Sequence, residues 1–233
     1  MASNKVGYEL ADTVAVLRMD DGKVNALSHE VIEALHECLD RAEPEAAAVL
    51  LVGRGGRLSG GFDLGEMTSS AEAARKLVSA GAELLLRLYS FPRPVVVACT
   101  GHALAAGALL LLVGDLRIGA SGSFKIGLNE VSIHLTLPIF AMELARARLS
   151  KRHFTCAVTQ AQIFDPETAK DAGYLDATAA PAALYNVALD HARRLAGLPH
   201  PAFRNTKENE RGATVRFCRE TLAADMAKLT SPK

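Results

Sequence analysis

The segment GHALAAGALLLLVGD, residues 101–115, joins a run of small residues to a purely aliphatic stretch. A core helix does not require a start that is stripped of side chains. Small residues let a ligand approach the backbone closely, and the free N–H groups at a helix start favour negative charge. The segment therefore predicts a site where main-chain N–H groups act as hydrogen-bond donors. A small-residue helix start packed against a strand is the purely structural alternative.

Composition limits the classes of protein to which this chain can belong. The 233 residues are 49% hydrophobic and 22% charged, which fits one substantial core, alone or with a small appendage. Basic and acidic residues balance at 26 each, so no net field attracts nucleic acid or an anionic membrane surface. The longest apolar run, residues 103–113, is too short to span a bilayer.

The N-terminus MASNKVGYEL has no apolar signal core. The four cysteines form no CxxC pair, which argues against a disulfide framework and against a metal site: they are Cys38, Cys99, Cys156 and Cys218. We expect a cytoplasmic protein that holds no metal and binds neither nucleic acid nor a membrane.

Strand-like and helix-like segments alternate along most of the chain, and this alternation predicts an α/β fold. Apolar runs predict strands over residues 13–19, 47–53, 94–101 and 115–120. Apolar residues at helical spacing predict helices over residues 28–43, 70–90, 165–173, 181–197 and 214–229. Ser28 and Asp165 are the expected caps of two of these helices, with Pro166 at a first helical position and Gly173 as a stop.

A boundary near Asp165 divides the chain into a core, residues 1–165, and a helical region, residues 166–233. The helical region is too short to fold alone, so we expect it to pack on the core or on a neighbouring subunit.

Six segments of the sequence resemble the enoyl-CoA hydratase/isomerase family, the crotonases. RLSGGFDLGEM (57–67) and GHALAAGALLLLVGDLRIGA (101–120) resemble the paired signature of that family. The supporting segments are GKVNALS (22–28), PRPVVVACTG (92–101), GLNEVSIHLTLP (127–138) and FDPETAKDAGYLD (164–176). The resemblance implies a spiral of ββα units with a helical C-terminal region, assembled as a homotrimer or hexamer. It also implies an acyl-CoA substrate and no separate cofactor, because coenzyme A is part of the substrate.

The resemblance also implies roles for particular residues. The N–H groups of Phe62 and Ala106 would stabilise the oxygen of a thioester enolate, and Glu130 would be the catalytic carboxylate. The implied substrate-binding residues are Asn25, Ala26, Gly61, Leu109, His134 and Lys207. Among these, Lys207 would meet a CoA phosphate, and His134 would line the pocket or orient the acid.

Three positions depart from the family pattern, and one of them, Leu109, favours one reaction over another. Leu109 stands where hydratases of the family carry the first of two glutamates, and a leucine cannot exchange a proton. Ala106 stands where glycine is common, and Asn129 where proline is common. One carboxylate suffices to move a proton from C2 to C4 of a 3-enoyl thioester, so the sequence favours double-bond isomerisation over hydration. Apolar surroundings would raise the pKa of Glu130 toward neutrality.

Other interpretations remain open. The chain could be an acyl-CoA-binding homologue with little catalysis, or a true hydratase that uses another group to hold the water. Glu130 could be an ordinary surface glutamate. Asp115 and Arg117 are expected to form a buried pair or a cap, and Glu66 to be a solvated helix end.

Overall fold

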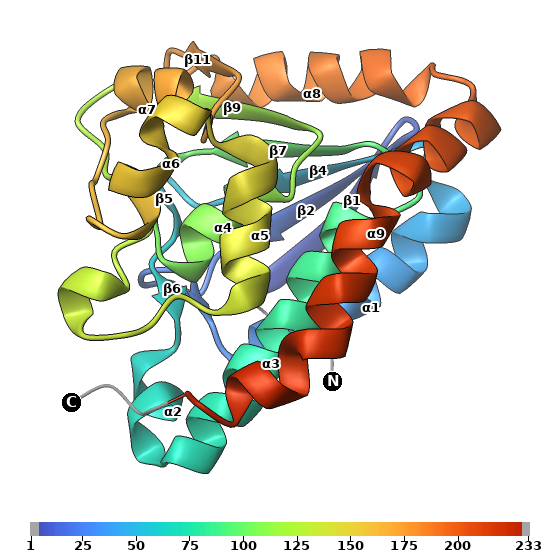
Figure 1. The fold of residues 1–233 in the computed structure, drawn as a ribbon. Helices are drawn as coiled ribbons and strands as arrows, with labels where there is room; N and C mark the ends of the chain where they lie inside the picture. Colours follow the sequence, from blue (N-terminus) through green and yellow to red (C-terminus); the bar gives the residue numbers. More distant parts are fainter. Residues whose placement is uncertain (1–4, 230–233) are drawn as a thin grey trace.

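The computed structural model describes residues 5–229, and its centre is a six-stranded sheet with the strand order β1-β2-β4-β7-β9-β11 (Figure 1). β1 and β2 are antiparallel, and the remaining neighbours are parallel. The strands are β1 (Val6–Ala11), β2 (Val14–Met19), β4 (Ala48–Val52), β7 (Val95–Cys99), β9 (Leu116–Ala120) and β11 (Ala177–Ala179). The four strands predicted from apolar runs are confirmed as β2, β4, β7 and β9.

Two small parallel sheets lie beside the large one and complete the spiral of ββα units. One has the order β10-β8-β5, and the other pairs β3 with β6. Their strands are β3 (Ala26–Leu27), β5 (Gly56–Ser59), β6 (Gly61–Phe62), β8 (Gly101–Leu104) and β10 (Ile126–Gly127). The predicted α/β class is therefore confirmed, and the small sheets carry the two segments that the sequence marks as chemical.

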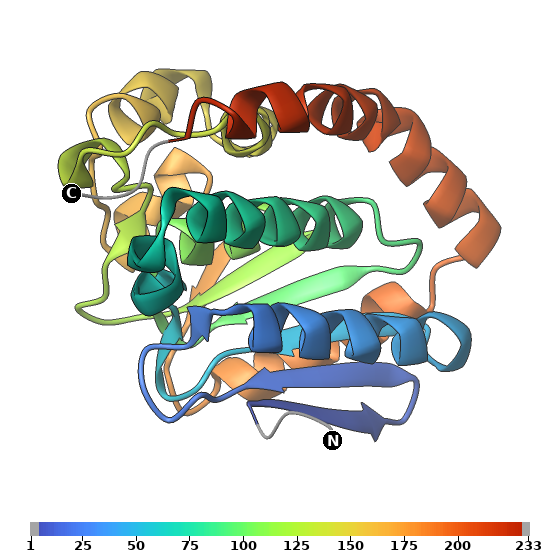
Figure 2. The same ribbon diagram turned by 90° about the horizontal axis from the view of Figure 1, so that it is seen from below.

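Helices cover both faces of the large sheet (Figures 1 and 2). α8 packs on one face, and α1, α3 and α4 pack on the other. The helices are α1 (His29–Glu45), α2 (Leu64–Ser69), α3 (Ala71–Tyr89), α4 (Ala106–Leu112), α5 (Ile139–Arg148), α6 (Lys151–Val158), α7 (Pro166–Ala172), α8 (Leu184–Ala196) and α9 (His200–Met226), with a 3₁₀ turn η1 (Val131–Ile133). The caps are as predicted: Ser28 accepts from Val31 N–H, and Asp165 accepts from the first turn of α7, which ends at Gly173.

Strand alternation divides the core into two apolar clusters. In β2, Val14 and Val16 face one cluster, whereas Ala15 and Leu17 face the other. β4 and β7 are buried at every position, as expected of parallel strands covered on both faces.

The long helix α9 begins at His200, so the predicted start at Thr214 is wrong. Lys207, Arg211 and Val215 are buried at helical spacing, but two of these residues are charged. An apolar pattern cannot reveal a helix turn whose buried positions are charged. α9 then crosses α3 and α5 toward the end of the molecule that holds α2 (Figures 1 and 2).

The chain beyond residue 165 contributes to the central sheet. β11 pairs with β9, and α8 supplies Leu184, Ala188 and Ala192 to one apolar cluster. The division at residue 165 therefore stays a prediction about packing and assembly. None of the helices in residues 5–229 is long and apolar enough to cross a membrane. The cytoplasmic location stays a prediction.

Candidate active site

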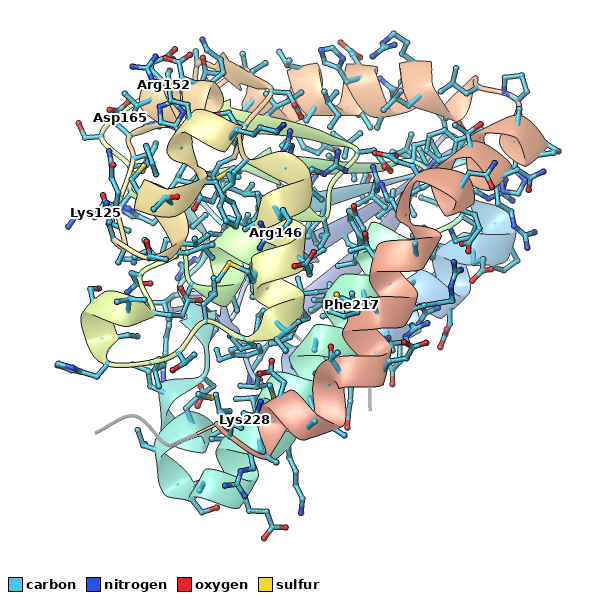
Figure 3. All side chains as sticks on the ribbon, in the orientation of Figure 1. Lys125, Arg146, Arg152, Asp165, Phe217 and Lys228 are labelled. Atoms are coloured by element: carbon cyan, nitrogen blue, oxygen red, sulfur yellow. The ribbon has the colours of Figure 1, made fainter. Side chains whose placement is uncertain are left out.

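A cavity of about 340 Å³ opens between β6, the start of α4, the segment after β10 and the end of the described chain. We call it the candidate active cavity. Its walls are mostly apolar: Gly60, Phe62, Leu64, Met67, Val78, Ala105, Leu109, Asn129, Glu130, Ile133, Leu135, Thr136, Pro138, Phe140 and Leu229 line it. The C-terminal end of α9 reaches this wall near α2, where Figure 3 labels Lys228. There, Arg75 of α3 donates a hydrogen bond to the Leu229 carbonyl at 3.4 Å.

Among the lining residues in the described part of the chain, Glu130 is the only acidic one. The residue is 9% exposed, and its Oε2 atom is buried without a hydrogen-bond partner. Burial raises the pKa of Glu130 to about 7, because the apolar walls disfavour the charged form. The prediction of a shielded acid with a raised pKa is therefore confirmed, and Glu130 is not a surface glutamate.

The loop around Glu130 is held by its own backbone. The Glu130 carbonyl accepts hydrogen bonds from Ile133 N–H at 3.0 Å and from Leu135 N–H at 2.9 Å. The Asn129 carbonyl accepts from Ser132 N–H at 3.1 Å and from the Ser132 hydroxyl at 2.7 Å. These bonds fix the backbone and leave both adjacent side chains directed at the cavity. Asn129 Oδ1 is buried there without a partner.

Leu109 lies on α4, is 1% exposed, and shares the candidate active cavity with Glu130. The two positions that the sequence comparison treats as a catalytic pair are therefore brought together. The leucine offers neither a proton nor a ligand for water.

Phe62 and Ala106 are brought to adjacent backbone segments. A Cβ atom built on Gly61 would lie 3.6 Å from the Ala106 nitrogen and 3.1 Å from Ala105 Cβ. Gly61 has φ +104°, a conformation that favours glycine. The close approach of β6 to the start of α4 therefore requires glycine at position 61.

The two N–H groups are free of the ladders around them. Asp63 N–H donates to the Leu27 carbonyl at 3.1 Å, and neighbouring residues of a strand point their N–H groups to opposite sides, so Phe62 N–H points away from β3. Ala106 is the first residue of α4, where N–H groups have no intrahelical acceptor. The first hydrogen bonds of the helix come from later residues, because the Ala105 carbonyl accepts from the N–H groups of Ala108 and Leu109.

Ala105 adopts φ 50° and ψ −125°, a backbone conformation that alanine rarely takes. Such strain persists where the surroundings impose it, and it is common at functional sites. Gly107 has a different explanation, because a Cβ atom there would lie 2.2 Å from the Ser59 carbonyl oxygen. Glycine at position 107 is therefore needed for packing of α4 against β5.

Five of the six predicted substrate-binding residues do not line the cavity. Gly61 lies beside it, in the strand β6 that brings Phe62 to the start of α4. The buried Asn25 amide donates to the carbonyls of Met19 and Leu58, and Ala26 pairs with Gly61, so both hold the loop in place. His134 is exposed and lines a separate hollow beside Val158. Lys207 lies elsewhere, buried against Asp115 at 2.7 Å.

Two structural expectations are also corrected. Asp115 does not pair with Arg117; it pairs with Lys207 and Arg211, whereas Arg117 pairs with Asp176 at 2.6 Å. Glu66 is not a solvated helix end, because its carboxylate bonds the ring and the N–H of His29.

Met67 of α2, Val78 of α3, Ile133 of η1 and Leu229 beyond α9 supply apolar parts of the wall. Phe140 of α5 and the polar side chain of Asn129 were missed. The only signal for Asn129 was that it departs from the family pattern beside the acid.

The comparisons with known proteins agree with this architecture. The model of the enoyl-CoA hydratase/isomerase family matches residues 9–232. A solved structure of an enoyl-CoA hydratase/isomerase family protein from Pseudomonas syringae is 44% identical, with a TM-score of 0.96, covering 99% of this chain and 100% of that one. The fold and the family match show that this chain belongs to the enoyl-CoA hydratase/isomerase, or crotonase, family.

Relatives with both activities in their names are similar to this chain. One Mycobacterium tuberculosis protein is named an enoyl-CoA isomerase in one solved structure and a probable enoyl-CoA hydratase in another. The first of these structures has a TM-score of 0.92 and 39% identity, covering 97% of this chain and 99% of that one. A probable enoyl-CoA hydratase of Bacillus subtilis is 34% identical over 142 residues, which cover 59% of this chain and 54% of that protein. The chain thus spans about half the length of this curated relative.

Proposed function

We propose that this chain isomerises 3-enoyl-CoA thioesters to the conjugated 2-enoyl-CoA thioesters, with Glu130 as the proton carrier. The observation that carries the proposal is that, within residues 5–229, Glu130 is the only acidic residue lining the candidate active cavity, where its Oε2 atom is buried without a hydrogen-bond partner. Membership of an acyl-CoA enzyme family and the similarity to the Mycobacterium tuberculosis isomerase support it.

The reaction needs one base that later acts as an acid. The Glu130 carboxylate takes the C2 proton, the C2–H electron pair moves into a dienolate, and the neutral acid returns the proton to C4. A pKa near 7 suits both steps, because the carboxylate is neither too weak a base nor too weak an acid at neutral pH. The apolar walls favour the neutral form between the two transfers.

Phe62 and Ala106 are the proposed hydrogen-bond donors to the substrate. Their N–H groups, which the strand and helix ladders leave free, would donate to the thioester oxygen as it gains negative charge. Such donors need no reorganisation during the reaction. The strained backbone of Ala105 supports this role, because it sets the direction of the following N–H group.

Hydration of a 2-enoyl-CoA is the second candidate function. It is favoured by Asn129, whose Oδ1 atom is buried in the same cavity without a partner. Asn129 and Glu130 could together hold the attacking water that a second glutamate holds in hydratases of the family. An acyl-CoA-binding homologue without turnover is the third.

The test is an assay of the full chain with a 3-enoyl-CoA and with a 2-enoyl-CoA. We expect conversion of the first substrate, and we expect Glu130→Gln to lower kcat by about 10²–10⁴-fold. If the chain hydrates the 2-enoyl-CoA, and if Asn129→Ala lowers the rate of that hydration, the second candidate function would be established instead. Tight binding of both thioesters with turnover of neither would leave only the binding homologue.

Position 109 offers a matched pair of variants. Leu109→Glu supplies the missing carboxylate and should create hydratase activity, whereas Leu109→Gln has the same size and polarity without the charge. Equal hydration by the two variants would contradict the shared role of positions 109 and 130.

We also propose that residues 166–233 mediate assembly into a homotrimer or hexamer. Phe217 on α9 is 47% exposed, and Figure 3 labels it on the outer surface of that helix. Light scattering of the wild type and of Phe217→Glu tests this, and a monomeric wild type would contradict it.

A further inference from the structure

A second and larger cavity, of about 580 Å³, lies where α8 and α9 meet at one edge of the molecule (Figures 1 and 2). It shares no lining residue with the candidate active cavity. Four cationic and two acidic side chains line it: Arg148, Arg194, Lys207, Arg211, Asp115 and Glu210. We call it the cation-lined cavity.

Asp115 is the shielded acid of this cavity, and it serves two cations at once. Its carboxylate lies 2.7 Å from Lys207 Nζ and 2.8 Å from Arg211 Nη2, and it also accepts from Val95 N–H at 2.7 Å. Lys207 and Arg211 are 4% and 3% exposed. A single buried carboxylate is therefore shared by two buried positive charges, and buried charges are costly unless they are compensated.

The other charged residues of the cation-lined cavity leave it with more positive than negative charge. Arg148 donates to the carbonyls of Leu112 and Gly114 at 3.1 and 2.8 Å, and these bonds satisfy its donors without neutralising its charge. Glu210 pairs with Arg211 Nε at 3.2 Å, but its side chain is 58% exposed. Burial lowers the pKa of Lys207 to about 8; Asp115 opposes this shift, and the neighbouring Arg211 and Arg148 contribute to it.

Arg194 completes the cationic wall from α8. Among residues 5–229 it forms no ion pair within 4.0 Å, although Arg193 beside it pairs with Asp12 and Asp190. An exposed arginine without a partner faces a cavity whose floor already has too few negative charges. This arrangement attracts an anion.

The opposite wall is apolar. It is formed by Leu195, Leu198, Pro199, Ala202 and Phe203, and Leu198 is 43% exposed. The Phe203 ring centroid lies 5.5 Å from Lys207 Nζ, so the apolar and cationic walls meet at this pair. A simple inorganic anion would leave the apolar wall uncovered.

We propose that the cation-lined cavity binds an amphiphilic anion, with a carboxylate or phosphate head at the exposed Arg194, attracted by the buried cations Lys207 and Arg211, and an apolar body along Leu195, Leu198 and Phe203. Nothing in this proposal depends on the reaction at Glu130. The two heads share one chemistry, because both are oxyanions that accept charge-assisted hydrogen bonds from lysine and arginine.

Calorimetric titration of the full chain with four probes tests the proposal. Octanoate and octyl phosphate carry both a head and an apolar body, acetate carries only the head, and 1-octanol only the body. We expect saturable binding of octanoate, octyl phosphate or both, and at least about tenfold weaker binding of acetate and octanol. The stronger of the two anions identifies the head. Equal binding of octanol and octanoate, or binding of no probe, would overturn the proposal.

Variants separate this cavity from the candidate active cavity, which could also accept an acyl chain. Arg194→Glu should weaken anion binding by at least about tenfold, and Ala202→Trp should fill the cavity and abolish binding. Both positions are exposed, so these changes leave the core intact. Arg204→Glu is the matched control on an exposed position of α9 outside the cavity, and its affinity should be unchanged. Unaltered affinity in Arg194→Glu and Ala202→Trp would place the probe elsewhere and overturn the proposal.

Discussion

Glu130 and Asp115 are two shielded acids placed on either side of α4. Asp115 follows the C-terminal end of the helix, whereas Glu130 shares a cavity with residues of its N-terminal half. Asp115 is bonded by two cations and a backbone N–H, and Glu130 has a buried oxygen with no partner. The same chemical group is therefore fixed in one region and left available in the other.

The difference teaches that burial alone does not make an acid reactive. Lys207 and Arg211 hold the Asp115 carboxylate in place, and these contacts tie α9 to β7 and β9. The apolar walls around Glu130 raise its pKa to about 7, so it can gain and lose a proton at neutral pH. Removing the charge should therefore damage stability in the first region and activity in the second.

Asp115→Asn should have the largest effect on stability. It leaves Lys207 buried without a counter-charge and Arg211 with only the exposed Glu210, and breaking a buried pair in this way costs about 3–5 kcal/mol of unfolding free energy. Glu130→Gln removes a buried charge that no cation compensates, so its unfolding free energy should be equal to that of the wild type or higher. Urea denaturation of the three proteins measures both values. If both variants lost the same unfolding free energy, the proposed difference between Asp115 and Glu130 would be wrong.

Ala106→Pro should lower kcat by about 10²–10³-fold, the loss usual when one oxyanion donor is removed. Proline has no N–H but is tolerated at the first position of a helix. Ala106→Gly keeps the N–H and is the matched control, with kcat expected close to that of the wild type. Circular dichroism checks that both variants remain folded. A folded Ala106→Pro variant with wild-type kcat would show that the Ala106 N–H is not a donor to the substrate.

The sequence predicted the parts of the fold that local patterns determine. The cap, proline and stop around α7 were predicted because each acts within its own helix. β4 and β7 were predicted because an uninterrupted apolar run has few other places in an α/β protein. The early turns of α9 were missed because Lys207 and Arg211 are buried only through a contact with Asp115, far away in the sequence.

The residues of the candidate site also fall into those that the sequence predicted and those that it did not. Family resemblance placed Phe62, Ala106, Leu109 and Glu130, and the structure brings these four together. It also assigned Lys207 to the substrate, although the structure buries that residue against Asp115. The motif around position 207 specifies a lysine on the helix but not the partner that the rest of the fold supplies.

Leu109→Lys provides the smallest and most direct test, because it would give Glu130 a partner of the kind that Asp115 has. The proposed base must be ionised, so the wild-type kcat/KM should fall below pH 7 and be about tenfold lower at pH 6 than on the plateau. A cation within the same cavity stabilises the carboxylate, so the inflection in Leu109→Lys should move to lower pH by about 1–3 units. Leu109→Met is the neutral control of similar length and should keep the inflection near pH 7. An inflection at the same pH in all three proteins would mean that a group other than Glu130 controls the rate.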